Sequence, residues 1–363
     1  VLLVHDEPLE GGYGAEAYVR RLAAGLRDGG DTVDVIAGER CHQGVAKLLD
    51  VWDPAARRLV ASRARAIDAE IVHHHNISRE LSASVLGATD LPQVMTIHDR
   101  RLFGAREHPL GSPHRVVEAI GASAVLRTAR RRLTATIGVS EEVSRLARGA
   151  GLPAVSTVPV PAAEPVGVLV PAAQCRDLLV AARLAPDKGI DVVIDAFARL
   201  GEQAGPARLL IAGAGPQEAA LRTRARALGS RVEFLGWLDE TELSGLLGRV
   251  RALVVASIPG RRPEGSSLSA VEAARHRRAV IGSDDPAVAE VVTGLGAGPV
   301  VPAGDVAALT AALEQVLTDD AAVAAYSEAG SKAEVRHSIE SVAAATREVY
   351  RRAVGGGSVV GRA

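Results

Sequence analysis

The sequence predicts an α/β protein built from two Rossmann-like domains, each a doubly wound parallel sheet, that face a cleft. Short β-rich runs alternate with Ala-rich helical stretches along the chain, and several of these runs are almost continuously apolar. Continuous apolar runs are typical of parallel strands that helices cover on both faces. The length of 363 residues also exceeds what one hydrophobic core usually spans, so two domains are expected.

The predicted strands fall into two groups. In the first half of the chain, strand character is found in six runs, at 1–6, 32–38, 70–76, 92–99, 133–140 and 155–161. In the second half it is found in five runs, at 177–184, 207–215, 231–238, 252–257 and 279–284. Apolar residues at helical spacing predict helices over 15–26, 191–200 and 308–317.

A proline-rich seam separates the two groups of strands. Residues 158–174 carry Pro159, Pro161, Pro165 and Pro171 and one charged residue. Several prolines without helical periodicity are typical of a stiff linker.

The seam sets the expected domain boundaries. We expect a first domain over residues 1–165 and a second over residues 172–337. A last helix over 338–354 is expected to cross back to the first domain. The Gly-rich tail 355–363 is expected to be disordered.

Charge and cysteine content exclude several classes of protein. The net charge is −1 and the pI is near 6.9, so no basic field recruits nucleic acid or an anionic membrane. Cys41 and Cys175 are too few for a disulfide framework or a zinc site, and each is expected to be a small buried hydrophobe. The opening run VLLVHD is too short for a signal peptide, and no run reaches the roughly 18 apolar residues of a membrane span, which favours a soluble cytoplasmic protein.

Two cations stand where a strand passes into a helix. In VAARLAPDKGIDVVIDAF (180–197) a strand ends at Arg183, a turn carries Gly189, and a helix follows with Asp187 as its expected N-cap. Lys188 is one of three lysines in a chain whose usual cation is arginine. Cations beside a helix N-terminus suit a diphosphate, although a solvated charged loop is the alternative.

The segment LLIAGAGPQEAAL (209–221) matches part of a dinucleotide-binding fingerprint. Gly213 and Gly215 match its first two glycines, but Glu218 stands where a third glycine is needed for close packing of helix on strand. An NAD-binding protein is therefore disfavoured. What remains is a tight turn that lets the backbone approach a ligand.

Glu264 and Glu272 stand in PEGSSLSAVEAA with seven residues between them. Glu264 lies in a loop before a helix expected to begin near Ser267 or Ser269, where a carboxylate can accept hydrogen bonds from sugar hydroxyls and N–H groups can face phosphate. If the helix begins at 267, Glu272 lies more than one turn along it and can reach a second pair of hydroxyls, such as a ribose diol. The alternative is local, because Ser269 and Glu272 match a capping box.

Three consecutive histidines, His73, His74 and His75, raise the hypothesis of a metal site. Successive side chains of a strand point to opposite faces, so all three cannot converge on one ion. We expect them to line the acceptor side of the site or to be buried with partners. The basic run 126–133 lacks the aromatic anchors of an interfacial helix, so a solvated face is expected there and not membrane association.

Taken in order, these motifs resemble those of retaining glycosyltransferases of the GT-B fold, in the large group-1, GT4-type family. The resemblance is carried over most of the chain by GGYGAEAYVRRLAAGL, IVHHHN, TIHD, GVSEEV, VAARLAPDKGID, IAGAGP, VEFLGWL, ALVVASI and the Glu264/Glu272 pair. The chain departs from the family pattern at Ser266 and Ser267, which replace a bulky residue and a second glycine, and this change bears on the sugar pocket.

The resemblance implies a donor site for a nucleotide-sugar. Arg183 and Lys188 would clamp its diphosphate, Glu272 would hold the ribose hydroxyls, and Glu264 would hold the sugar hydroxyls. Further donor contacts, many of them through the backbone, would come from Gly12, Gly14, Gly213, Gly215, Leu235, Leu238, Ser266, Ser267, Leu268 and Ser269.

The resemblance also implies an acceptor side. His98, at the end of its strand, would lie near the reacting sugar and is counted with Arg183, Lys188 and Glu264 as catalytic. His73, His75 and Glu16 would face the acceptor. The acceptor would be a natural product, a glycolipid or a saccharide that presents a hydroxyl or another nucleophile.

The expected reaction needs neither metal nor cofactor. The chain has no Asp-x-Asp motif, so Arg183 and Lys188 would take up the charge of the leaving diphosphate in place of a metal. The family implies retention at the anomeric carbon, by a front-face route that requires no enzymic nucleophile. The alternatives are a nucleotide-sugar epimerase or hydrolase on the same fold and, less favoured, the NAD-binding protein.

Overall fold

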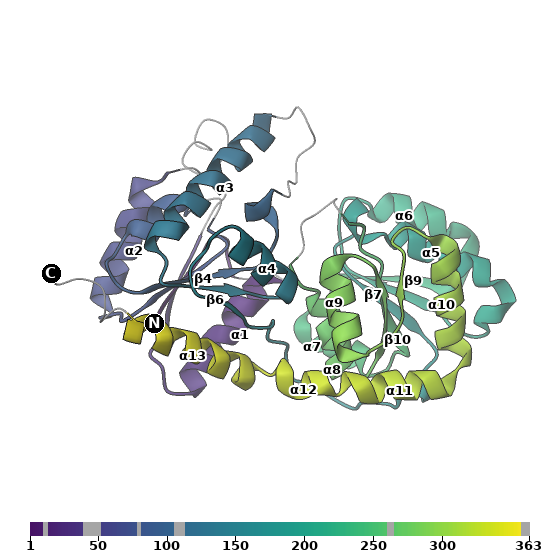
Figure 1. Cartoon of the computed structure of the whole chain (residues 1–363). Coiled ribbons are helices and arrows are strands. Elements are labelled where there is room, and N and C mark those ends of the chain that lie inside the picture. Colours follow the sequence, from purple (N-terminus) through teal and green to yellow (C-terminus); the bar gives the residue numbers. More distant parts are fainter. Residues whose placement is uncertain (10–13, 39–51, 78–80, 105–112, 260–264, 357–363) are drawn as a thin grey trace. The chain divides into compact units, whose positions relative to one another are not determined.

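The computed structural model describes residues 1–9, 14–38, 52–77, 81–104, 113–259 and 265–356. Contacts between residues divide the chain into two compact units (Figure 1). The first unit comprises Val1–Pro161, Pro263–Ser266 and His337–Ala363, and the second comprises Ala162–Arg262 and Ser267–Arg336. Each unit is thus assembled from segments that are distant in the sequence.

The first unit contains a six-stranded parallel sheet with strand order β2-β1-β3-β4-β5-β6. Its strands are β1 Leu2–His5, β2 Asp34–Ala37, β3 Val72–His75, β4 Gln93–Ile97, β5 Ala135–Gly138 and β6 Val155–Thr157. The register pairs His5 with His75 and His75 with Thr96. The polar residues at the carboxyl ends of β1, β3 and β4 are therefore adjacent.

Helices cover both faces of this sheet, as its apolar strands predict. They are α1 Ala15–Asp28, α2 Pro54–Ala66, α3 Pro113–Arg132, α4 Glu141–Gly149 and α13 Ile339–Gly356, with 3-10 turns at Ala83–Gly87 and Arg101–Phe103. Side-chain caps at several of the helix starts satisfy otherwise unpaired N–H groups. Asp53 accepts from the N–H groups of Ala55 and Ala56, and Ser140 accepts from that of Val143.

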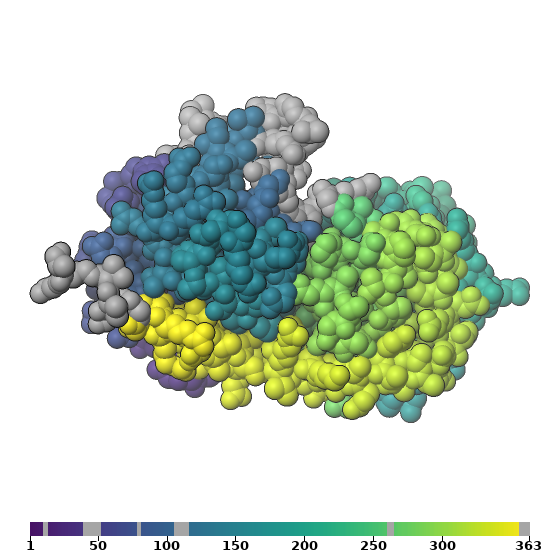
Figure 2. Space-filling view, in the orientation of Figure 1, coloured from purple at the N-terminus to yellow at the C-terminus, as the bar shows by residue number. Residues whose placement is uncertain are grey.

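The last helix, α13, packs on α1 in the first unit. A Cβ placed on Gly25 of α1 would lie 2.6 Å from the side chain of Ile339, so the glycine allows the two helices to approach closely. The Arg347 guanidinium donates to Asp31 at 2.6 Å beyond the end of α1. This helix, yellow in Figure 2, forms part of the surface of the first unit.

The basic run 126–133 lies at the end of α3. Val125 and Ala129 are completely buried, whereas Arg127 and Arg131 are exposed. The run thus presents a solvated face, as its sequence indicates. Among the described residues, no helix combines the length and apolarity that crossing a bilayer requires.

The second unit contains a parallel sheet with strand order β12-β11-β10-β7-β8-β9. Its strands are β7 Leu178–Ala181, β8 Leu209–Ala212, β9 Val232–Gly236, β10 Ala252–Val255, β11 Ala279–Ser283 and β12 Val300–Val301. The sequence predicts five of these six strands. It misses β12, because two residues between prolines carry too little pattern to be recognised as a strand.

The helices of the second unit lie on both faces of its sheet. They are α5 Ile190–Leu200, α6 Glu218–Ala225, α7 Glu240–Leu247, α8 Leu268–Arg275, α9 Pro286–Leu295, α10 Val306–Thr318, α11 Asp320–Gly330 and α12 Lys332–Arg336. Alternate residues of β8 belong to two different apolar clusters: Leu209 and Ile211 to one, Leu210 and Ala212 to the other. This alternation is the doubly wound packing that the sequence predicts.

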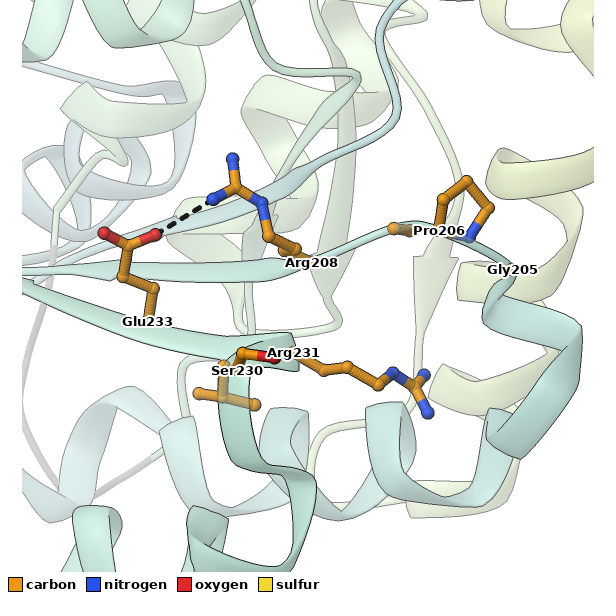
Figure 3. A pocket seen from close by; sticks show the side chains of 8 residues that line it. Gly205, Pro206, Arg208, Ser230, Arg231 and Glu233 are labelled. Atoms are coloured by element: carbon orange, nitrogen blue, oxygen red, sulfur yellow. Dashed lines mark hydrogen bonds and ion pairs between the residues drawn. The ribbon is translucent and has the colours of Figure 1, made fainter.

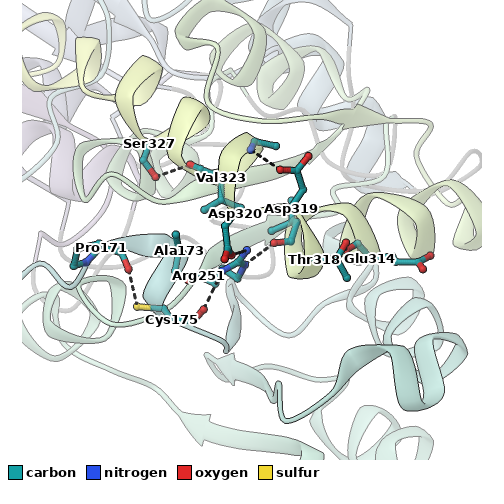
Figure 4. A network of polar contacts seen from close by, with 12 residues as sticks. Pro171, Ala173, Cys175, Arg251, Glu314, Thr318, Asp319, Asp320, Val323 and Ser327 are labelled. Atoms are coloured by element: carbon teal, nitrogen blue, oxygen red, sulfur yellow. Dashed lines mark hydrogen bonds and ion pairs between the residues drawn. The ribbon is translucent and has the colours of Figure 1, made fainter.

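A buried arginine anchors the linker to the second unit (Figure 4). The side chain of Arg251, just before β10, is fully buried and donates to the carbonyl oxygens of Ala173 and Cys175 at 2.9 and 3.3 Å. Its other nitrogens reach Val316 in α10 and Asp320 in α11. Backbone carbonyls and one carboxylate together compensate the buried charge. Cys175 is a buried free thiol, whereas Cys41 lies outside the described residues.

Candidate active site

The loops that follow β7 and β8 are joined through their backbones at the carboxyl edge of the second sheet. A Cβ on Gly213 would collide with the carbonyl oxygen of Ala182, and one on Gly215 would collide with that of Leu184. The N–H of Leu184 donates to the Ala214 carbonyl at 3.0 Å. The two predicted glycines are thus explained by the approach of one loop to another, which fixes the segment that carries Arg183.

Arg183 and Lys188 both lie in this joined loop. The Arg183 guanidinium, 43% exposed, donates to the Asp187 carboxylate at 2.9 Å. Lys188 ends the 3-10 turn Pro186–Lys188 and is partly buried. Gly189, at φ +59°, follows and packs so closely on the Ala256 carbonyl that a side chain would collide with it.

Asp187 does not have the predicted role of N-cap. Helix α5 begins after Gly189, without a side-chain cap, and the buried Asp187 carboxylate turns instead toward Arg183. The carbonyl oxygen of Asp187 accepts from Ile258, beyond β10, at 2.9 Å. This residue therefore links the loops after β7 and β10 and orients one of the two cations.

Helix α8 begins at Leu268, and Ser267 is its N-cap, accepting from the Ala270 N–H at 3.4 Å. Glu272 is then the fifth residue of the helix, so the local alternative of a capping box with Ser269 does not hold. Glu272 is partly buried, and Ser266, Leu268 and Ser269 are also partly buried near the start of the helix. The other glutamate of the pair, Glu264, lies outside the described residues.

The segment after β9 presents one exposed aromatic residue. Leu235 and Leu238 are partly buried and pack on one of the two apolar clusters. Between them stand Gly236, at φ +72°, and Trp237, whose side chain is 52% exposed. The carbonyl of Gly236 accepts from Gly213 at 2.6 Å, so this segment belongs to the same edge as the loops after β7 and β8.

In the first unit, four ionisable side chains meet at the carboxyl edge of the sheet. His75 Nδ1 and His98 Nε2 lie 3.0 Å apart, one donating to the other. His5 Nδ1 donates to the carbonyl oxygen of His75 at 3.3 Å, and His5 Nε2 lies 3.9 Å from Glu16 Oε1. Tyr18 of α1 packs edge-on against His98, with ring centroids 4.6 Å apart.

A second group of buried contacts lies behind these rings. His73 Nδ1 is 2.6 Å from the Tyr350 hydroxyl of α13, and His73 Nε2 is 2.7 Å from the Thr96 hydroxyl. His74 faces the other side of the sheet, where its Nε2 is 3.0 Å from Gln93 Oε1. His73, His74 and His75 are all completely buried, so they belong with the buried alternative that the sequence left open.

Burial keeps these imidazoles neutral. It lowers the pKa of His98 to about 3, with a further contribution from a charge on His5, and it lowers the pKa of His74 to about 4. Burial likewise holds the pKa values of His73 and His75 well below their usual range. Burial alone would raise the pKa of Glu16, but the influence of the nearby His5 side chain and hydrogen bonding, including that from its own backbone, together outweigh burial, so the pKa is lowered and the carboxylate is charged at neutral pH.

Two glycines border this edge of the first unit. Gly14 is the N-cap of α1 at φ +82°, a conformation that favours glycine, and Gly12 lies outside the described residues. Gly265, which the contacts assign to the first unit, lies against the backbone at His98. A Cβ there would collide with the His98 carbonyl oxygen. The glycine after Glu264 is therefore required sterically.

The described residues contain no cluster of three or more histidine, cysteine or acidic side chains with the geometry of a metal site. A cavity of about 490 Å³ lies in the second unit at the amino ends of β8 and β9, between Gly205, Arg208, Arg231 and Glu233 (Figure 3). Arg208 and Glu233 form an ion pair there at 3.1 Å. The cavity is at the opposite ends of these strands from Arg183, so it is separate from the candidate donor site.

Comparison with known proteins identifies the family. The family model for glycosyl transferases group 1 matches residues 172–333, and that for glycosyltransferase family 4 matches residues 12–161. A glycogen synthase of Mycobacterium tuberculosis is 30% identical over 292 residues, which cover 77% of this chain and 68% of that protein. The chain belongs to the group 1 glycosyltransferases. The phosphatidyl-myo-inositol mannosyltransferase of Mycolicibacterium smegmatis is a further relative, 27% identical over 95% of this chain and 91% of its own.

Solved structures of other glycosyltransferases share the fold. A sucrose-phosphate synthase from Thermosynechococcus elongatus superposes with a TM-score of 0.73 at 18% identity, covering 98% of this chain and 99% of its own. Anabaena HepE in complex with UDP and glucose superposes with a TM-score of 0.68 at 16% identity, covering 96% and 99%. Two parallel six-stranded sheets with flanking helices are the GT-B fold, as the sequence predicts.

Several residues around the candidate site of this family member were missed from the sequence. Tyr350 lies 277 positions from its partner His73, and no local pattern connects the two. His5 could have been found, because it ends a predicted strand next to the one that ends in the histidine run. Trp237 carried a compositional signal, since the chain has only two tryptophans, Trp52 and Trp237.

Proposed function

We propose that this chain is a metal-independent, retaining glycosyltransferase that moves a sugar from a nucleoside diphosphate sugar to a hydroxyl of an acceptor. The observation that carries the proposal is the pair of cations beyond β7. Arg183 is oriented by Asp187, and Lys188 follows it on a turn that packs against the loop after β10.

The two cations would stabilise the leaving group. As the bond between the anomeric carbon and the phosphate oxygen breaks, the nucleoside diphosphate departs with the electron pair, and its charge grows. Charge-assisted hydrogen bonds contribute about 1.5–3 kcal/mol each. A loss of about 3 kcal/mol of transition-state stabilisation costs more than a hundredfold in rate. Arg183 and Lys188 would supply this stabilisation of the leaving diphosphate without a metal.

The new glycosidic bond would form on the same face. The acceptor oxygen attacks the anomeric carbon as the diphosphate leaves, and the hydroxyl proton passes to the departing phosphate oxygen. This route needs no enzymic nucleophile, and we assign none. Glu272 would hold the ribose hydroxyls, Glu264 the sugar hydroxyls, and His98 would lie beside the reacting sugar.

The names of the relatives suggest the substrate classes. They include mannosyltransferases of phosphatidyl-myo-inositol, a glycogen synthase and a sucrose-phosphate synthase, and the HepE structures contain UDP and glucose. We therefore propose a hexosyl donor and an acceptor that is a saccharide, a glycolipid or a natural product.

A matrix of nucleotide-sugars against acceptors of these classes, read by mass spectrometry, tests the proposal. We expect a product heavier by one hexosyl unit, formed equally well in EDTA. Nucleoside diphosphate release that does not depend on an added acceptor would indicate the epimerase or hydrolase alternative. A thermal-shift panel with UDP, GDP, ADP and NAD separates nucleotide-sugar chemistry from NAD binding, because only nucleoside diphosphates should stabilise the protein.

A further inference from the structure

Buried aromatic side chains form a row in the first unit, running from α13 to the carboxyl edge of the sheet. Tyr350 is hydrogen-bonded to His73, and His75 is hydrogen-bonded to His98. Between these two pairs, the rings of His73 and His75 have centroids 4.2 Å apart. His73 and His75 are completely buried, whereas His98 is partly exposed. The row thus starts at the last helix and ends at the side chain nearest the proposed chemistry.

The hydrogen bonds restrict where the protons lie. His75 Nε2 is buried and has no hydrogen-bond partner among the described residues. If it carried a proton, an N–H donor would be buried without an acceptor, which is rarer in proteins than an unpaired acceptor. We therefore place the proton of neutral His75 on Nδ1. It then donates to His98 Nε2, and the proton of neutral His98 is left on Nδ1.

We propose that His75 is a positioning residue that holds His98 as its Nδ1–H tautomer and fixes the orientation of its ring. This proposal rests on the proposed function in one respect, namely that His98 faces the reacting sugar. Because Nε2 of His98 accepts the hydrogen bond from His75, the nitrogen of His98 that is left for a ligand is Nδ1, and it carries a hydrogen. His98 then donates a hydrogen bond to a substrate oxygen and does not act as a base.

The remaining contacts prevent His75 from turning. The ring of His73 lies against it, and both nitrogens of His73 are bonded, to Tyr350 and to Thr96. The backbone of His75 is also held, because its carbonyl oxygen accepts from His5. Other ionisable groups near His98 are Glu16 and Tyr18 of α1, and the burial of His98 keeps its imidazole neutral at neutral pH.

Three substitutions at one position test the role of the bond. In His75→Asn, the side-chain amide occupies about the place of Nδ1 and can still bond His98. In His75→Gln, the amide extends to the place of Nε2, and in His75→Ala it is absent. We expect kcat to fall about tenfold or more in the Ala and Gln variants, with little change in KM, and to recover largely in the Asn variant. Equal loss in all three would overturn the proposal.

The tautomer is measured directly by ¹⁵N NMR of histidine-labelled protein, with His98→Gln to assign the signals. The wild type should show His98 protonated on Nδ1, and His75→Ala should lose this preference. His98 protonated on Nε2 in the wild type would overturn the assignment. This measurement needs no substrate, so it decides the proton position even where no transfer activity is found.

A control variant separates positioning from general stability. His74→Asn alters a side chain that is equally buried on the same strand but faces Gln93 on the other side of the sheet. It should lower the melting temperature about as much as His75→Asn, while leaving the His98 signals and kcat unchanged. If His74→Asn lowers kcat as His75→Ala does, His75 acts only through the stability of the fold.

Discussion

The carboxyl edges of the two sheets hold their polar residues in different ways. In the second unit, Arg183 and Lys188 lie on a loop whose shape is set by backbone packing at Gly189, Gly213 and Gly215. In the first unit, the imidazole rings of His73 and His75 are packed in the interior and held by side-chain hydrogen bonds. A charged side chain at the edge of the second sheet can therefore be replaced without disturbing the fold. At the edge of the first sheet, the rings near the proposed site are also part of the packed interior, so a substitution there changes both.

The largest effect on turnover is expected at the carboxyl edge of the second sheet. Lys188→Ala should lower turnover by about ten- to 150-fold, because one charge-assisted contact to the leaving diphosphate, worth about 1.5–3 kcal/mol, is lost, while the melting temperature changes little. Turnover is measured as acceptor-dependent release of nucleoside diphosphate. Lys332→Ala, which removes an exposed lysine of α12 in the same unit, is the control and should have no effect. Normal turnover in Lys188→Ala would disprove the clamp.

A backbone substitution at the same edge should act on stability instead. Gly213→Ala places a Cβ against the Ala182 carbonyl at φ +137°, and we expect a loss of about 2 kcal/mol or more in the free energy of unfolding, measured with denaturant. Gly104→Ala is the control, since Gly104 also has a positive φ, +105°, in the left-handed region, but open space around it. It should cost about 1 kcal/mol. Equal losses would show that the contact between the loops is unimportant.

Acid should destabilise the first edge. The pKa of His74 is about 4 in the folded protein, lowered by burial from a usual 6.5, so below pH 6.5 the unfolded chain binds more protons than the folded one. Stability is fully present above pH 6.5 and is lost as the pH falls toward 4. At pH 5 the loss from this residue is about 2 kcal/mol. His74→Asn should lessen the pH dependence of unfolding by this amount, and an unchanged pH dependence would contradict the burial of a neutral ring.

The smallest effect is expected from the partner of Arg183. Asp187→Asn keeps a hydrogen-bond acceptor for the guanidinium but removes the charge. Because Arg183 is 43% exposed and solvent screens the pair, turnover should fall only a few-fold. Steady-state kinetics at low and high salt measure this. A hundredfold loss would mean that Asp187 has a part in the reaction beyond orienting Arg183.

Local pattern predicted the elements of the fold better than it predicted contacts between loops. Eleven of the twelve strands follow from apolar runs, and β12 was missed because it has only two residues. Gly213 was predicted from a motif and as a donor contact, but its sequence position does not reveal that it also packs against the Ala182 backbone, a contact between segments about 30 residues apart. Asp187 looked like an N-cap because its sequence position fits one, but helix α5 begins only after Gly189, and the Asp187 carboxylate pairs instead with Arg183, four residues earlier in the chain.

The candidate site was predicted as separate residues and not as a network. The histidine run at 73–75 was recognised, and the alternation of a strand correctly separates His74 from His73 and His75. The hydroxyl that bonds His73 comes from Tyr350 near the end of the chain, and periodicity within a helix cannot reveal which strand that helix will cover. Long-range partners of this kind depend on the packing of α13.

The return of α13 to α1 has a consequence for synthesis on the ribosome. The face of α1 at Gly25 is covered only after the 175 residues from Ala162 to Arg336 have been translated. At 5–20 residues per second, about 10 to 35 s pass during which the nascent first unit lacks its closing helix. Throughout that interval the residues of α1 that α13 covers in the folded protein have no partner from the last helix, a delay that a domain of contiguous sequence would not have.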